Sequence, residues 1–273
     1  MINFEFILLA QKECLLPSYT GQIIRGALLQ MITKHDQILA DKLHEGNKIR
    51  PYSLSPLMGF NKRLIRTRRG EITVEKGTMM KFRMGILTNQ LAERMVNISL
   101  QKESMNLKLA EGEFKVTSIE IKKKNVIEIL TENESPPSTF SLSFLTPTYF
   151  NIAKQEFPMR FPDPRYLFMN LASLWNAFNE EKVLVDQTEL FSWLENHISI
   201  NAYKLSTHSV YIAKNAPKIG FKGWARYQLS GEEGYQRWIH ALAQYAEFSN
   251  IGANRTAGLG CVNYKTKSQQ NES

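Results

Sequence analysis

The sequence predicts an α+β protein made of two tandem ferredoxin-like (RRM-like) domains, over 1–134 and 139–265, followed by a disordered tail at 266–273. Three observations lead to this prediction. Apolar periodicity in the first half of the chain gives the order strand, helix, strands, helix, strand. The second half repeats that order. Between the halves lies Thr131 to Ser138, whose Glu, Asn, Ser and Pro residues are typical of a linker.

The elements of the first half follow from the spacing of its apolar residues. Phe4 to Leu9 is almost wholly apolar and predicts a first strand. The stretch after Pro17 carries apolar residues at three- and four-residue steps, which predicts an amphipathic helix. Asp36 can cap a second helical segment, and Gly46 can end it. Strands are then expected at 63–68, 71–75 and 79–86, a helix at 88–100, and a hairpin of strands at 113–121 and 125–130.

The second half has the same kinds of element in the same order. A strand is expected at 139–152 and helices at 166–179 and 187–196. Residues 198–213 and 219–229 alternate apolar and polar residues, which predicts two strands. A helix over 232–248 and a last strand over 261–265 complete the domain. Open sheets of this fold often bind RNA on one face.

Composition identifies a globular chain. Its 273 residues include 43% apolar and 22% charged residues, and its formal net charge is +8. Cys14 and Cys261 are the only cysteines, which excludes a disulfide framework and a cysteine-based zinc site. The longest early apolar run, Phe6 to Ala10, is far shorter than the roughly 20 residues of a membrane helix and follows no basic leader. We therefore expect a cytoplasmic protein with no signal peptide and no membrane partner.

Positive charge is concentrated in the first half, where residues 1–138 hold 21 Lys and Arg against 15 Asp and Glu. The densest cluster lies within 61–70 and contains Lys62, Arg63, Arg66, Arg68 and Arg69. Phosphate backbones attract such clusters because binding releases counterions. The same segment also suits the solvated strand of an ordinary hairpin. RNA binding by these five cations is the functional interpretation.

A glycine-rich segment, Ser249 to Gly260, lies between the last predicted helix and the last predicted strand. Glycines permit positive φ, and successive N–H groups in such a turn form an anion-binding concavity. No Gly-Lys-Ser/Thr follows and a strand comes next, which excludes a Walker NTPase loop. A tight helix-to-strand connection is the alternative. The RNA-binding candidates of this segment are Gly252, Asn254, Arg255, Thr256, Gly258 and Gly260.

This segment resembles the glycine-rich loop of the RAMP superfamily of CRISPR-associated proteins, and in particular its repeat-processing endoribonucleases. The similarity runs from Glu247 to Gly252 and again from Gly258 to Val262. It departs at Asn250, where the family often has another glycine, but Asn tolerates positive φ. Leu16-Pro17 and the helix that follows are similar to the family's first helix. Leu29 stands where some members carry a catalytic tyrosine.

Cleavage of RNA by its own 2′-hydroxyl needs a base, an acid and a cation near the phosphorane. The resemblance implies a catalytic His and a nearby Lys in the stretch that holds His44 and Lys48. A helix C-terminus favours the charged imidazolium, which makes His44 an acid rather than a base. Capping of a helix end on the surface is the alternative for His44. His35 is the second candidate.

A nuclease that uses Mg²⁺ needs clustered carboxylates, and the acidic pairs Glu180-Glu181 and Glu232-Glu233 flank predicted helices instead. We therefore expect no metal and no cofactor. The resemblance implies a metal-independent endoribonuclease that cleaves precursor CRISPR RNA within repeats and leaves 2′,3′-cyclic phosphate and 5′-hydroxyl ends. Its partners would be CRISPR repeat RNA and other CRISPR effector subunits, and the chain would be a monomer or homodimer. The alternatives are a non-catalytic RAMP subunit that holds guide RNA and a structural protein of the same fold.

Overall fold

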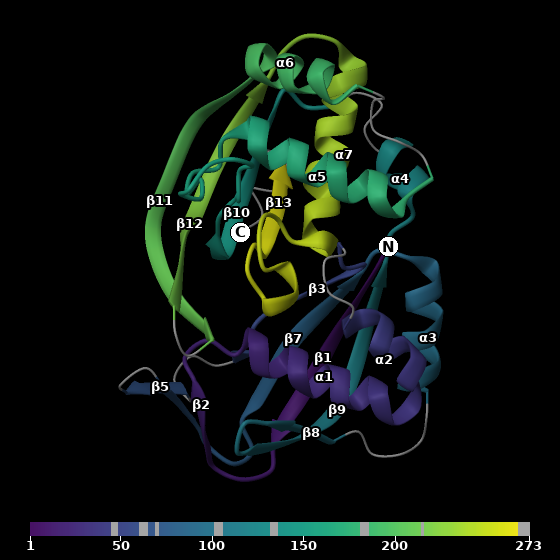
Figure 1. Ribbon diagram of the computed structural model, residues 1–273, viewed down its shortest axis with the longest axis vertical. Coiled ribbons are helices and arrows are strands. Elements are labelled where there is room, and N and C mark those ends of the chain that lie inside the picture. Colours follow the sequence, from purple (N-terminus) through teal and green to yellow (C-terminus); the bar gives the residue numbers. More distant parts are fainter. Residues whose placement is uncertain are drawn as a thin grey trace. The chain divides into compact units, whose positions relative to one another are not determined.

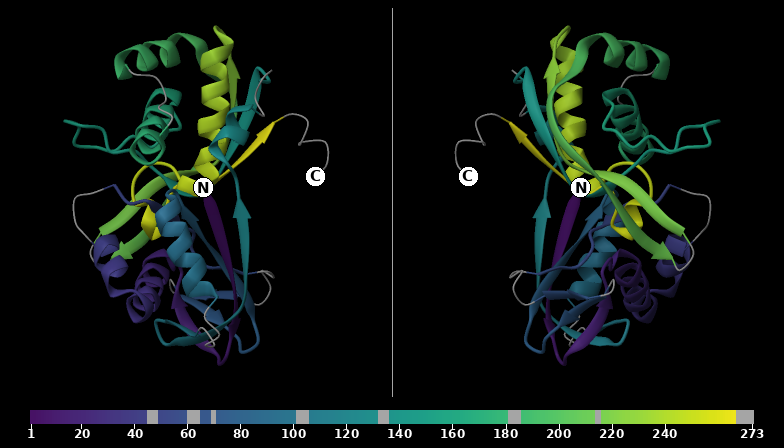
Figure 2. Two further views of the ribbon diagram at one scale, coloured as in Figure 1. Left: turned by 90° about the vertical axis from the view of Figure 1, so that its right-hand side faces the viewer. Right: turned by 90° about the vertical axis from the view of Figure 1, so that its left-hand side faces the viewer.

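The computed structural model describes residues 1–44, 49–59, 65–68, 71–100, 106–131, 136–180, 186–213 and 216–266 (Figures 1 and 2). The chain divides into two compact units. Unit 1 contains Met1–Lys123, Tyr211–Ala216 and Thr256–Gly258, and unit 2 contains the remainder. The domain limits expected from the sequence, 1–134 and 139–265, stay a prediction. Of the expected tail, Thr266 ends the last strand, and 267–273 lie outside the described residues.

The main sheet of unit 1 has the order β3-β7-β1-β9-β8, with β4 also paired to β7. All of these pairs are antiparallel. The first strand lies inside the sheet, between β7 and β9, and largely alternates buried with half-buried positions, as expected when one face of the sheet packs on a core. The strands are β1 (Ile2–Ala10), β3 (Tyr52–Leu54), β4 (Met58–Gly59), β7 (Met79–Ile86), β8 (Asn106–Leu109) and β9 (Gly112–Lys123).

Two helices pack against this sheet, α1 (Gly21–His35) and α3 (Asn89–Ser99) (Figure 1). Phe6 of β1 and Phe82 of β7 stack with ring centroids 4.7 Å apart at the centre of the core. A shorter helix, α2 (Gln37–His44), follows α1. The order β1, α1, β3, β7, α3, β9 is the β-α-β-β-α-β order of a ferredoxin-like domain.

A second, three-stranded sheet of unit 1 has the order β2-β6-β5. It is built from β2 (Cys14–Pro17), β6 (Glu71–Val74) and β5 (Ile65–Arg68). Arg66 and Arg68, which belong to the basic cluster at 61–70, therefore lie on a strand at the edge of this small sheet.

Unit 2 repeats the arrangement with the strand order β11-β12-β10-β13. Its elements in chain order are α4 (Val126–Thr131), β10 (Thr139–Thr148), α5 (Pro164–Phe178), α6 (Gln187–His197), β11 (Ile198–Ala213), β12 (Ala216–Leu229), α7 (Glu233–Ser249) and β13 (Val262–Thr266). The last strand pairs with the first, as in unit 1, since both units follow the same β-α-β-β-α-β path.

Aromatic side chains form the core of unit 2 between the sheet and the helices α5 and α7. Phe140 of β10 lies 5.2 Å from Tyr227, 6.1 Å from Phe168 of α5 and 5.0 Å from His240 of α7, measured between ring centroids. Because the three partners come from three different elements, this cluster joins both helices to the same face of the sheet.

One predicted element is wrong. Residues 125–130 were expected as a strand, but 126–130 belong to the helix α4. The Glu128 carboxylate accepts a hydrogen bond from the Asn125 N–H at 3.0 Å, and the Asn125 oxygen accepts one from the Ile129 N–H at 3.2 Å. These bonds satisfy main-chain groups at the start of a helical turn and outweigh the strand preference of a short β-branched run.

Candidate functional site

The glycine-rich loop connects α7 to β13 and contains a short 3₁₀ turn, Arg255–Ala257. Gly252, Gly258 and Gly260 all have positive φ, between 69° and 87°. A Cβ atom on Gly260 would lie 1.8 Å from the Ile251 oxygen, and one on Gly252 would lie 2.3 Å from the Tyr149 oxygen. These contacts are closer than any side chain tolerates, so the loop requires glycine at both positions.

Main-chain hydrogen bonds hold the base of the loop. The Ile251 N–H donates to the Gly260 oxygen at 2.9 Å, which joins the two arms of the loop. The Ala253 N–H donates to the Tyr149 oxygen at 3.0 Å, and the Gly260 N–H donates to the Pro147 oxygen at 3.2 Å. The last two bonds attach both arms to the end of β10. The N–H groups of the loop base are therefore used within the protein.

Two polar side chains inside the loop stabilise it further. Asn250 is fully buried with φ of 55°, and its Nδ2 donates to the Arg255 and Leu259 oxygens at 3.3 and 3.1 Å. Arg255 is 7% exposed and donates from Nη1 to the Ser249 oxygen at 2.6 Å. These contacts assign structural roles to Asn250 and Arg255. RNA contact by Arg255 stays a prediction.

The tip of the loop is its more accessible part. Asn254 is exposed, and its Nδ2 donates to the Tyr149 hydroxyl at 2.5 Å. Burial raises the pKa of Tyr149, and the hydrogen bond from Asn254 opposes that rise. Thr256 is half-buried, whereas Gly258 is buried. Of the residues predicted to bind RNA here, Asn254 and Thr256 are thus the most open to a ligand.

Within unit 1, the residues Ala257 and Gly258 lie close to the start of α1. A Cβ atom on Gly21 would lie 1.9 Å from the Ala257 oxygen. A Cβ atom on Gly258 would lie 3.0 Å from the Pro56 nitrogen and 3.1 Å from the Tyr19 hydroxyl. Gly21, the first residue of α1, therefore has no room for a side chain. At Gly258 a side chain would be crowded, and the φ of 87° also favours glycine. The sequence analysis took Gly21 as part of a helix and missed this contact.

The predicted catalytic residues lie near the ends of α1 and α2. His35 is the last residue of α1 and is half-buried. Asp36 separates the two helices: its Oδ1 accepts from the Leu39 N–H at 2.9 Å, and its Oδ2 pairs with Arg94 at 2.6 Å. The helix break expected at Asp36 is confirmed, together with its capping role.

His44 is the last residue of α2, as far as the backbone is described. Its side chain and the whole of Lys48 lie outside the described residues. Close by, the guanidinium of Arg50 donates to the Leu43 oxygen and so satisfies one carbonyl at the C-terminus of α2. A catalytic grouping of His44, Lys48 and His35 stays a prediction.

The basic cluster of the sequence is described only in part. Lys62, Arg63 and Arg69 lie outside the described residues. Arg66 and Arg68 belong to β5, where the backbone register places them opposite Thr73 and Glu71 of β6. The structure thus locates two of the five predicted cations on the edge strand of the small sheet.

One face of the sheet in unit 2 carries an aromatic ring and cations that were not among the predicted site residues. Arg226 of β12 lies opposite Ser141 of β10, which lies opposite Lys265 of β13, and Trp224 lies opposite Ser143. The Arg226 guanidinium carbon is 6.0 Å from the centroid of the Trp224 ring. Alternate residues of a strand share a face, so these residues combine an aromatic ring with two cations on one sheet surface. The alternation of Trp224 and Arg226 with buried residues was the available signal.

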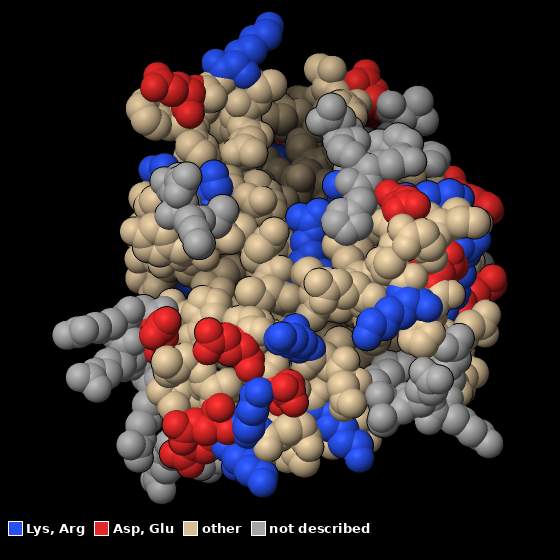
Figure 3. Space-filling model, turned by 60° about the horizontal axis from the view of Figure 1, so that its bottom comes forward, with Lys and Arg blue, Asp and Glu red and all other residues tan. Residues whose placement is uncertain are grey.

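Figure 3 shows how charge is distributed over one face of the molecule. Among the described residues, Lys and Arg side chains are interspersed there with Asp and Glu side chains. The formal net charge of +8 therefore does not by itself delimit a binding surface on that face.

Within the described ranges, no group of three or more His, Cys, Asp or Glu side chains is placed to hold a metal ion. None of the helices in these ranges is both long enough and apolar enough to cross a membrane.

Two family models match the chain. The model described as "Cas6 N-terminal domain" matches residues 2–124, and the model described as "CRISPR-associated endoribonuclease Cas6" matches residues 142–262. Relatives named CRISPR-associated endoribonuclease Cas6, from two strains of Mycobacterium tuberculosis, are 26% identical over 194 residues. The match covers 68% of this chain and 59% of the length of those relatives.

Solved structures share the fold. A Cas6 product complex superposes with a TM-score of 0.76 and 20% identity, over 96% of this chain and 99% of that chain. Thermus thermophilus Cas6 superposes with a TM-score of 0.67 over 96% and 97% of the two chains, again at 20% identity. A structure titled "An RAMP protein binding different RNA substrates" gives a TM-score of 0.64 at 13% identity, over 97% and 100% of the two chains.

These likenesses cover nearly the whole chain and confirm the predicted pair of ferredoxin-like domains. The family resemblance inferred from the glycine-rich loop and the first helix is confirmed as well. With both family models matched in consecutive order, the chain belongs to the Cas6 family of CRISPR-associated proteins.

Proposed function

We propose that the chain is an endoribonuclease that cleaves precursor CRISPR RNA within its repeats. The observation that carries this proposal is the glycine-rich loop between α7 and β13, whose shape is maintained by glycine packing and internal hydrogen bonds in a member of the Cas6 family. Relatives that bear the name of an endoribonuclease support the activity. The substrate is CRISPR repeat RNA, other CRISPR effector subunits are its further partners, and the protein works in the cytoplasm as a monomer or homodimer.

The reaction is attack of a 2′-hydroxyl on the neighbouring phosphate. The new bond joins the 2′-oxygen to phosphorus, and the bond from phosphorus to the 5′-oxygen breaks. The proton of the 2′-hydroxyl passes to a base, and an acid protonates the leaving oxygen. The products are a 2′,3′-cyclic phosphate and a 5′-hydroxyl. Because the nucleophile belongs to the RNA, this route has no requirement for a metal-bound hydroxide.

His44 is assigned the acid, with His35 as the second candidate. The position of His44 at the C-terminal end of α2 favours the protonated imidazole, since the helix dipole is negative there. Lys48 supplies positive charge to the phosphorane. The two residues are close enough in sequence to serve one phosphate.

RNA contact involves three groups of residues. The loop tip offers Asn254 and Thr256 to the phosphate backbone. The basic segment of unit 1 attracts phosphates through Lys62, Arg63, Arg66, Arg68 and Arg69. The sheet of unit 2 adds Trp224 for base stacking, with Arg226 beside it.

The test is a cleavage assay with repeat RNA, in which wild type is compared with His44→Ala and with His208→Ala. His208 lies exposed on β11 and bonds only to Ser206 among the described side chains, so it serves as the matched control. Wild type and His208→Ala should cut equally, and His44→Ala should lose at least about a hundredfold in rate. Equal rates for all three proteins would show that His44 takes no part in the reaction, and His35→Ala would then be assayed in the same way.

Two further arms test the mechanism. A substrate with 2′-deoxyribose at the scissile nucleotide should resist cleavage, because it lacks the nucleophile. Excess EDTA should leave the rate unchanged. Cleavage of the deoxy substrate, or complete loss of activity in EDTA, would contradict the proposed route. Tight RNA binding without any cleavage by wild type would favour the non-catalytic RAMP subunit instead.

A further inference from the structure

A cavity of about 430 Å³ adjoins the glycine-rich loop within unit 2. It opens between the start of the β10–α5 connection, the outer side of α5 and the first arm of the loop. The residues that bound these three sides are Phe150 and Asn151, then Tyr166, Asn170 and Ser173, then Gly252. Its volume is in the range of sites that hold small organic groups.

The lining of the cavity is uncharged throughout. It combines two aromatic rings, Phe150 and Tyr166, the thioether of Met169, two side-chain amides and the two hydroxyls of Tyr166 and Ser173. A phosphate is held best by cations, and a metal ion by carboxylates, histidines or thiolates. Neither set is present in this lining. A flat, neutral group with hydrogen-bonding edges is the ligand that such walls suit.

Asn170 gives the cavity a donor of known orientation. Its Oδ1 accepts a hydrogen bond from the Gly252 N–H at 2.8 Å. The oxygen of the amide is thereby identified, and the Nδ2 group keeps its two donors for another partner. This half-buried residue therefore couples the conformation of the loop to the chemistry of the cavity.

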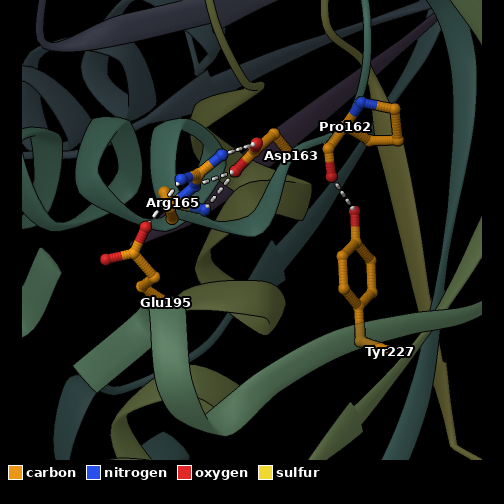
Figure 4. Close-up of polar contacts among 5 residues, drawn as sticks. All are labelled: Pro162, Asp163, Arg165, Glu195 and Tyr227. Carbon is orange, nitrogen blue, oxygen red and sulfur yellow. Dashed lines mark hydrogen bonds and ion pairs between the residues drawn. The ribbon is translucent and has the colours of Figure 1, made fainter. Parts of the chain in front are cut away.

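The walls are positioned before any ligand arrives. Phe150 and Met159 exchange two main-chain hydrogen bonds, at 3.0 and 2.9 Å. The start of α5 is held by Asp163, which accepts from the Arg165 main chain, while the Arg165 guanidinium bridges to Glu195 of α6 (Figure 4). Fixed walls reduce the ordering cost of binding.

We propose that this cavity holds one unpaired nucleobase of the RNA that the glycine-rich loop contacts. The inference rests on the proposed function, because the loop is taken to bind RNA. The base inserts against Phe150, Tyr166 and Met169, and an acceptor on its edge takes a hydrogen bond from Asn170 Nδ2. A base lifted out of the strand in this way fixes the register of the RNA along the loop.

The test measures dissociation constants for repeat RNA and for a series of RNAs in which each base in turn is removed. Ser173→Phe fills the cavity from an exposed position on α5. Ala177→Phe places the same ring one helical turn further on, at an exposed position outside the lining, and is the matched control. Neither residue belongs to the proposed catalytic or RNA-binding groups.

Ser173→Phe should weaken binding about tenfold, and Ala177→Phe should change it less than about twofold. One abasic position should weaken wild type about tenfold and should not weaken Ser173→Phe further, since both changes remove the same contact. Equal affinities of the two variants would refute the binding of a base in the cavity. So would an equal loss of affinity at the abasic position in wild type and in Ser173→Phe. Either result would leave the proposed function intact. Absence of any repeat-RNA binding by wild type would overturn both.

If Ser173→Phe proves misfolded by circular dichroism, Asn170→Asp replaces it. That change keeps the oxygen that accepts from Gly252 and replaces the donors with a negative charge. Asn170→Asp should weaken the binding of repeat RNA about tenfold, and the same abasic position should not weaken this variant further. An unchanged affinity would refute the assignment of Asn170.

Discussion

Asn250 Nδ2 donates a hydrogen bond to the Leu259 oxygen at 3.1 Å, across the full width of the glycine-rich loop. The side chain thereby does more than tolerate the positive φ of 55° that the backbone adopts. It also bonds to the Arg255 oxygen, so that one buried amide satisfies two carbonyls of the opposite arm. An asparagine here supplies contacts that a glycine cannot.

Replacing Asn250 should separate the contribution of its two side-chain hydrogen bonds from the effect of its positive φ. Asn250→Gly keeps the backbone conformation and leaves two buried carbonyls without this donor, at a cost of about 1–3 kcal/mol in the free energy of unfolding. Asn250→Ala loses the same bonds and, unlike the glycine variant, keeps a Cβ atom at φ of 55° and ψ of 174°, a backbone region that costs about 1–3 kcal/mol for residues other than glycine. Urea unfolding of both variants checks the order. A glycine variant as stable as wild type would show that the two bonds contribute nothing.

Two glycines of α1 should respond in opposite directions to the same substitution. Gly26→Ala introduces a methyl group with no atom within 4 Å and should stabilise the protein by about 0.5–1 kcal/mol, because alanine is the better helix former. Gly21→Ala places its methyl group against the Ala257 oxygen and should destabilise by about 1–3 kcal/mol. Thermal unfolding of the pair gives the comparison, and a gain in stability for Gly21→Ala would contradict the close contact.

His240 should make stability depend on pH. Its Nε2 lies 2.7 Å from the Pro137 oxygen, its Nδ1 lies 2.6 Å from the Tyr264 hydroxyl, and burial lowers its pKa below the ordinary 6.5. The unfolded chain therefore binds a proton near pH 6.5 that the folded chain does not. This contribution to stability is complete above pH 6.5 and declines as the pH falls, by at most about 1.4 kcal/mol per pH unit.

The control for this pH effect is His240→Gln, which can donate to Pro137 and accept from Tyr264 without titrating. The free energy of unfolding, measured by urea between pH 5 and 8, should fall more steeply for wild type than for the variant below pH 6.5. Parallel profiles would show that His240 titrates alike in the folded and unfolded chains.

Asp163 begins α5, where its carboxylate accepts from the Arg165 N–H at 2.9 Å and pairs with the Arg165 guanidinium at 2.7 Å (Figure 4). Asp163→Asn keeps the acceptor for the main chain and weakens the ion pair, whereas Asp163→Ala removes both. The alanine variant should lose about 1 kcal/mol more than the asparagine variant, which is the usual value of an N-cap. Equal losses, measured by thermal unfolding, would assign the effect to the ion pair alone.

Local patterns in the sequence were sufficient for most elements and for the order of both domains. The three- and four-residue spacing of apolar residues in α1 and the alternation in β12 are properties of neighbouring residues, which the chain carries before it folds. The short run at 125–130 was predicted wrongly because a few β-branched residues are compatible with a strand or a helix. The hydrogen bond from the Asn125 N–H to the Glu128 carboxylate stabilises the helix.

The candidate site also combines features that local sequence shows with features that depend on the fold. Neighbouring positions along the chain place the glycines, Asn254, Arg255 and Thr256 in one loop and put His44 at the end of a helical segment. Folding of the chain is needed to bring Arg255 into its hydrogen bond inside the loop, and to put Trp224 and Arg226 of β12 on one sheet face with Lys265 of β13. These relations join residues far apart in the chain, and they depend on strand order and packing, which no local pattern encodes.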